Sequence, residues 1–118
     1  MTVREKLITA LAGLGYPIDL QGSYEPDNIP DTFITYFIAD TTDLQHYNNR
    51  PAKTGYSLNV NFYSRSMDLV NTVPDQISDA LLDAGFTREG PGYDAGLDKD
   101  TGHYGWLMDY YLTVRKDV

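Results

Sequence analysis

The chain has 118 residues, 42% of them hydrophobic, which is enough for one domain with its own core. Cysteine is absent, which excludes a disulfide framework, a thiolate metal site and a cysteine nucleophile. The formal net charge is -8, and the 9 basic residues are scattered along the chain, so we expect no direct binding to a nucleic-acid backbone.

The N-terminal segment predicts a helix. Thr2 and Glu5 have the spacing of a capping box, and apolar residues recur on one helical face through residues 3–14. The following residues, 16–31, are interrupted by prolines and a glycine. They predict a surface connection, with room for a short strand near Ile18.

The middle of the chain predicts two strands separated by a polar loop. Residues 32–39 carry apolar side chains at both odd and even positions, which is typical of a strand covered on both faces. Residues 40–55 are polar and predict a loop, with one short strand near residues 44–47. Residues 56–63 alternate between apolar and polar, as a half-buried strand does.

A second helix follows. Ser66 can cap it, and Pro74 within it forces either a kink or a restart capped by Thr72. Gly85 and Phe86 stand in the order of a Schellman motif, so we expect the helix to end there.

The C-terminal third predicts a turn-rich segment and a final strand. Residues 87–102 contain four glycines and allow a short strand near Tyr93, and residues 103–114 alternate in what we expect to be the longest strand. The element order predicts an α+β fold in a single domain over residues 1–118. Its sheet is antiparallel or mixed, with four to six strands, and both main helices pack on one face.

Residues suited to catalysis or metal binding are few. Only His46 and His103 could act as imidazole bases, and we interpret them as a polar-loop residue and a solvated or hydrogen-bonded surface residue. Asp94, Asp98 and Asp100 resemble part of a calcium loop, but no glutamate follows at the required place, so solvated turn residues are the preferred interpretation. We predict no enzymatic activity and no cofactor. No segment approaches the ~20 apolar residues of a membrane span, so we expect a soluble protein.

Five strings occur in one order along the chain: PDTFITYF (30–37), YNN (47–49), the strand at 56–64, AGFT (84–87) and DKDTGHYG (98–105). Together they resemble small tail proteins of long-tailed phages and prophages of Gram-positive bacteria, of the tail-terminator and head-tail joining type. The resemblance covers residues 7–111. It implies a subunit without catalytic residues that forms a ring, commonly a hexamer, and contacts the tail tube and the head connector. The implied location is the virion tail, and the host cytoplasm during assembly.

Two polar segments are the expected contact elements. The first is the loop at 41–55, whose candidate residues are His46, Tyr47, Asn48, Asn49 and Arg50. The second is 89–102, whose candidate residues are Tyr93, Asp94, Asp98 and Asp100. Two alternatives stay open: another neck or minor tail component, and a small acidic inhibitor or immunity-type protein that covers a basic partner.

Overall fold

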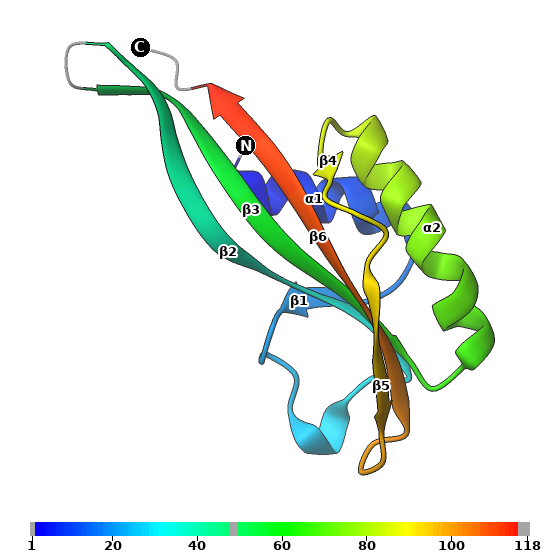
Figure 1. Cartoon of the computed structure of the whole chain (residues 1–118). Coiled ribbons are helices and arrows are strands. Elements are labelled where there is room, and N and C mark those ends of the chain that lie inside the picture. Colours follow the sequence, from blue (N-terminus) through cyan, green and yellow to red (C-terminus); the bar gives the residue numbers. More distant parts are fainter. Residues whose placement is uncertain (1, 48–49, 116–118) are drawn as a thin grey trace.

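Six strands form one mixed sheet, and two α-helices cover one of its faces (Figure 1). The computed structural model describes residues 2–47 and 50–115, without the side chains of Pro26, 45–47 and 50–52. The helices are α1 (Val3–Leu11) and α2 (Met67–Asp83), with short 3-10 helices η1 (Ala12–Leu14) and η2 (Pro26–Asn28). The strands are β1 (Ile18–Leu20), β2 (Thr32–Tyr47), β3 (Arg50–Ser64), β4 (Thr87–Arg88), β5 (Tyr93–Asp98) and β6 (His103–Arg115). The predicted α+β class is confirmed.

The strand order is β1-β2-β3-β6-β4, and β5 also pairs with β6. The β1–β2 pair is parallel, and every other pair is antiparallel. Because β3 occupies one side of β6, both β4 and β5 lie on its other side, at different positions along the strand. The short strands predicted near Ile18 and Tyr93 are therefore present as β1 and β5.

Helix α1 begins at the predicted capping box. The Thr2 hydroxyl accepts a hydrogen bond from the Glu5 backbone N–H at 3.1 Å, and the Glu5 carboxylate accepts one from the Thr2 N–H at 3.1 Å. After η1, Gly15 adopts φ 82°, a left-handed conformation that favours glycine and ends the helical segment.

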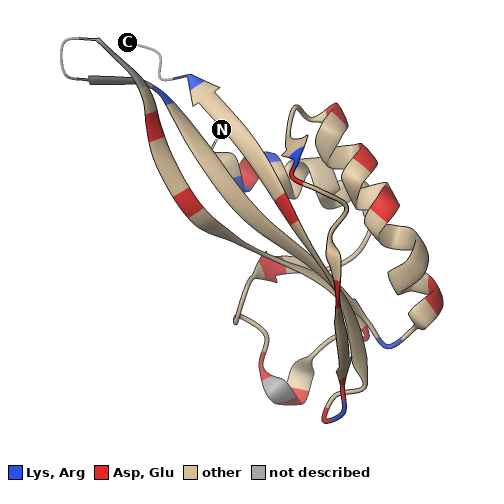
Figure 2. Ribbon diagram, viewed as in Figure 1, with Lys and Arg blue, Asp and Glu red and all other residues tan. Residues whose placement is uncertain are grey.

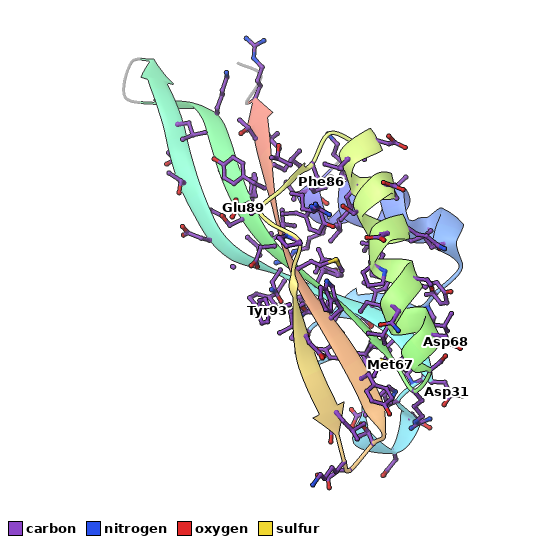
Figure 3. All side chains as sticks on the ribbon, turned by 45° about the vertical axis from the view of Figure 1, so that its right-hand side comes forward. Asp31, Met67, Asp68, Phe86, Glu89 and Tyr93 are labelled. Atoms are coloured by element: carbon purple, nitrogen blue, oxygen red, sulfur yellow. The ribbon has the colours of Figure 1, made fainter. Side chains whose placement is uncertain are left out.

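Helix α2 continues through Pro74 as one helix, so it does not restart at Thr72. Its end is the predicted Schellman motif. Phe86 donates its backbone N–H to the Leu81 carbonyl at 2.9 Å, and Gly85, at φ 97°, donates to the Leu82 carbonyl at 3.1 Å. The Phe86 side chain is consequently buried between α2 and the sheet (Figure 3).

The prediction of a polar loop at residues 40–55 is wrong, except that the short strand predicted near residues 44–47 is present as the end of β2. β2 continues to Tyr47 and β3 begins at Arg50, so the two strands form one long antiparallel hairpin, with a register shift between Ile38 and Asp40. The hairpin extends beyond the helices (Figure 1), where no core requires apolar side chains. Backbone pairing therefore continues through polar residues whose sequence pattern predicts a loop. For the same reason β6, with 13 residues, is not the longest strand, since β2 has 16 and β3 has 15.

The main core lies between the helices and the sheet face that they cover, here called the inner face. Its largest fully buried side chains come from both helices and from three strands: Leu7, Leu11, Ile34, Leu58, Val60, Phe62, Val73, Ile77, Leu81, Met108 and Tyr110. The residues between them on β2 and β3 point to the outer face. Phe33, Thr35 and Asn61 are nevertheless buried. Because both helices lie on the inner face, other segments of the chain must cover these three residues. This confirms that the first part of β2 is covered on both faces.

Candidate functional site

A cavity of about 340 Å³ lies on the outer face of the sheet. Its floor is formed by side chains of β2 and β3, including Phe33, Thr35 and Tyr63, and by Gly105 of β6. Its walls come from the segment after β1, and from β5 together with the turn that leads to β6. The complete lining is Gln21, Gly22, Tyr24, Ile29, Phe33, Thr35, Tyr63, Ala95, Gly96, Leu97, Asp98, Thr101, His103 and Gly105. We call this cavity the aromatic pocket.

Aromatic rings form one side of the aromatic pocket. The Phe33 ring centroid is 5.2 Å from that of Tyr63, in a stacked arrangement, and 4.7 Å from that of Tyr24. Burial raises the pKa of the Tyr63 hydroxyl, and hydrogen bonding to Gln21 and Thr35 partly offsets the rise. Burial and the nearby Asp19 carboxylate raise the pKa of Tyr24. Both phenols are therefore neutral at neutral pH, and both rings are among the groups that line the cavity.

A polar cluster lies beside these rings. The Thr35 hydroxyl donates a hydrogen bond to the Gln21 side-chain oxygen, and the Asn61 amide nitrogen is 3.5 Å from each of these oxygens. Asn61 is only 3% exposed, and its Oδ1 has no hydrogen-bond partner among the described residues. An unpaired buried acceptor is costly, typically by about 1–3 kcal/mol. Asn61 itself is not among the residues that line the aromatic pocket.

The charge at the aromatic pocket is negative. Asp98 is the charged residue among those that line it, and Asp19 lies close enough to Tyr24 to affect its ionisation. Arg65 approaches from outside, but its guanidinium pairs with Asp31 and donates to the Thr101 carbonyl at 2.9 Å. Figure 3 shows Asp31 near the first residues of α2.

His103 also lines the aromatic pocket, and its predicted place on the surface is wrong. The side chain is 4% exposed, its Nε2 lies 2.8 Å from the Pro30 carbonyl oxygen, and its ring meets Phe33 edge-on with centroids 5.3 Å apart. Since the partner is a carbonyl, Nε2 must carry the hydrogen of this bond. The prediction of a hydrogen-bonded histidine is correct. Its burial arises because the segment before β2 folds against the start of β6.

The acidic candidates of the second predicted contact segment stabilise their own turns. Asp94 Oδ1 accepts a hydrogen bond from the Gly96 N–H at 2.9 Å, and Asp98 Oδ1 accepts one from the Asp100 N–H at 3.0 Å. Within the part of the chain that the structure describes, no three His, Cys, Asp or Glu residues are placed to hold a metal ion. Tyr93 is different, because its side chain is 55% exposed and projects away from α2 (Figure 3).

The candidates of the first contact segment lie at the end of the β2–β3 hairpin. Tyr47 and Arg50 are paired in the register of the two strands, and His46 lies on β2, so these residues belong to strands rather than to a loop. Asn48 and Asn49, and the side chains of His46, Tyr47 and Arg50, lie outside the described residues. Their contact with a partner stays a prediction.

The sheet has an uncovered strand on each side. On one side, β1 pairs with β2 only from Ile34 to Tyr36, and among the described residues no strand pairs with the outer side of β2 from Phe37 onward. We call this the β2 edge. On the other side, β5 pairs only with β6, and we call its outer side the β5 edge.

Large exposed apolar side chains lie at both edges. Leu20 and Phe37 are 40% and 36% exposed next to the β2 edge, and Tyr93 and Leu97 are 55% and 50% exposed on β5.

No protein-family model and no curated protein sequence matches this chain.

Acidic residues are spread over the rest of the surface. Figure 2 shows them along α2 and along β2 in the extended hairpin, with fewer basic residues between them. In the described part of the chain no helix combines the length and the hydropathy needed to cross a membrane.

Proposed function

We propose that the protein is a non-enzymatic structural subunit that assembles with copies of itself into a closed ring. We further propose that this ring belongs to a phage tail, as a tail-terminator or head-tail joining protein located in the virion tail. The ring is supported by the surface of the fold, and the phage tail by the five strings that resemble such proteins.

The observation that carries the ring is that the two uncovered strands lie on opposite sides of one sheet. An uncovered strand presents free backbone N–H and C=O groups, which readily pair with another strand. If the β2 edge of one copy pairs with the β5 edge of the next, the contact joins two different surfaces. Repeating such a head-to-tail contact with a constant rotation closes a ring.

The exposed apolar residues support this pairing. Phe37 next to the β2 edge and Tyr93 on the β5 edge would leave water when the two edges meet. Burying a fully exposed side chain of this size contributes roughly 1.5–3 kcal/mol, and Phe37 and Tyr93, at 36% and 55% exposed, would each contribute a corresponding fraction of it. Apolar residues at both edges are therefore favourable for a contact between copies and unfavourable for a lone monomer.

The charge fits a ring through which DNA passes. The net charge is -8, and Asp40 and Asp43 lie exposed along the β2 part of the hairpin. Because the protein surface and the phosphate backbone are both negatively charged, the surface offers DNA no binding site, and DNA can slide past it without being bound. A ring whose channel is lined mainly by basic residues would contradict this part of the proposal.

The test of the ring uses light scattering coupled to size-exclusion chromatography. We expect a closed oligomer for the wild-type protein, and monomers for Phe37→Lys and Tyr93→Lys, because a buried lysine at the contact is costly. The matched control is Leu82→Lys, which places the same charge at an apolar residue of α2 that is 48% exposed. Dissociation by Leu82→Lys to the same extent would show that the edges are not the contact.

The test of the phage-tail role adds the purified protein to polymerising tail-tube subunits, followed by electron microscopy. We expect capped tubes of limited length with the wild-type protein and uncapped tubes with Phe37→Lys. Tubes that grow equally long with and without the wild-type protein would overturn this role and leave the ring itself untouched.

A second candidate is an acidic inhibitor, which the exposed carboxylates of α2 favour. Asp68, Asp75, Asp79 and Asp83 are all exposed on this helix, where they could cover a basic partner. Such a protein would act as a monomer. A wild-type protein that stays monomeric, alone and with tail-tube subunits, would therefore favour the inhibitor over the ring.

A further inference from the structure

The aromatic pocket lies on the outer face, where side chains from distant segments meet, and it shares β5 with the ring contact proposed above. Gln21 follows β1, Phe33 and Thr35 lie on β2, Tyr63 lies on β3, and Asp98 ends β5. Its volume of about 340 Å³ is within the usual range of ligand pockets. Its chemistry identifies the kind of group that it suits.

We infer that the aromatic pocket binds a cationic side chain of a partner protein, and that this side chain is an arginine. The inference does not depend on the ring. Two features of the pocket support it: the aromatic rings that line it and its negative charge.

The rings supply the first feature. Tyr24, Phe33 and Tyr63 all line the cavity and lie within 5.2 Å of one another in successive pairs, from centroid to centroid. The face of an aromatic ring attracts a cation within about 6 Å, and the flat guanidinium group of arginine also stacks on it. Because the tyrosines are neutral phenols, both act through the ring face rather than through a fixed charge.

The charge supplies the second feature. Asp98 lines the aromatic pocket and Asp19 lies near Tyr24, whereas the pocket lining in the described structure includes no lysine or arginine. Arg65 is already engaged by Asp31 and by the Thr101 carbonyl. With a net charge of -8, the protein attracts cations over a longer range as well and repels acidic ligands.

The test is an NMR titration of the ¹⁵N-labelled full chain with N-acetyl-arginine amide, and with N-acetyl-citrulline amide as the neutral control of the same shape. We expect saturable shifts for the amides of Gln21, Thr35 and Gly105 with the arginine probe, and roughly tenfold weaker binding of the citrulline probe. Repeating the titration on Phe37→Lys separates this result from the oligomeric state, because Phe37 does not line the pocket.

Two variants locate the charge effect. Asp98→Asn keeps the Oδ1 that accepts the Asp100 N–H and removes the negative charge, so it should weaken the arginine probe several-fold and leave the citrulline probe unchanged. Asp79→Asn on α2 removes the same charge far from the pocket and should change neither. Equal binding of the two probes, equal effects of the two variants, or no saturable shift up to roughly 0.1 M arginine probe would each overturn the inference.

Discussion

Gly105 lines the aromatic pocket, and replacing it with alanine tests directly how tightly the residues of that pocket are packed. Gly105 on β6 is the cross-strand partner of Tyr63 on β3. A methyl group at Gly105 would lie 2.8 Å from Cδ1 and from Cε1 of the Tyr63 ring, and 3.0 Å from Cβ of Ala95. Carbon atoms pack at about 3.5–4.0 Å, so Gly105→Ala has to displace the ring.

The size of the effect follows from what the ring would lose. Tyr63 is stacked on Phe33 at 5.2 Å, so the ring cannot move without disturbing that pair. Forcing a methyl group into packed surroundings costs typically ~1–3 kcal/mol, whereas alanine in place of glycine recovers ~0.4–1 kcal/mol by restricting the unfolded chain. The backbone of Gly105 has no left-handed φ to add strain. We therefore expect the free energy of unfolding to fall by about 1–2 kcal/mol.

Urea denaturation followed by circular dichroism measures this change. Gly13→Ala is the matched control, because a methyl group at Gly13 meets no atom within 4 Å and Gly13 has no positive φ. This control should be neutral or slightly stabilising. In a Tyr63→Leu background the cost of Gly105→Ala should largely disappear, since the ring that it clashes with is absent. An unchanged cost in that background, or a Gly105→Ala protein as stable as Gly13→Ala, would refute the reasoning.

Three further predictions concern the helices and the core. The hydrogen bond from the Thr2 backbone lowers the pKa of Glu5 below its ordinary value of 4.5. The stabilisation by the ionised Glu5 carboxylate is therefore present above that value and is lost as the pH falls through the folded-state pKa. In thermal unfolding, Glu5→Gln should be less stable than wild type at neutral pH and equally stable in strong acid. Burial raises the pKa of Tyr110 above 10.0, so stability is lost as the pH rises past that value, and Tyr110→Phe should lose less stability in an alkaline unfolding series. Ile77→Ala should reduce the free energy of unfolding by ~2–5 kcal/mol, because Ile77 is fully buried between α2 and the sheet, whereas Gln76→Ala on the exposed side should change it little in the same urea experiment.

Predictions from sequence succeeded where a signal joins residues that are close together in the chain. The capping box of Thr2 and Glu5 and the Schellman motif of Gly85 and Phe86 are formed as predicted, because each is closed by hydrogen bonds within a single turn of chain. The alternation in β3 also identified its inner face correctly, since successive side chains of a strand point to opposite faces.

Predictions failed where the partner of a segment is distant. Residues 40–55 were expected to form a loop because they are polar, yet they pair as two strands, since cross-strand backbone bonds do not require apolar side chains. His103 was expected at the surface because it begins a strand after a polar turn. It is buried by Pro30 and Phe33, which lie about seventy residues earlier in the sequence.

The sequence by itself determined the α+β class, the capped start of α1, the Schellman end of α2, the inner face of β3 and the acidic surface, because these depend on composition and on local patterns. Only the tertiary structure decided the aromatic pocket and the two uncovered edges. Gln21, Phe33, Tyr63 and Asp98 come from four separate segments, and they meet because β3 and β5 pair with opposite sides of β6 while the segment after β1 folds over β2. Strand order of this kind follows from the packing of the whole chain, and no periodicity within a single segment encodes it.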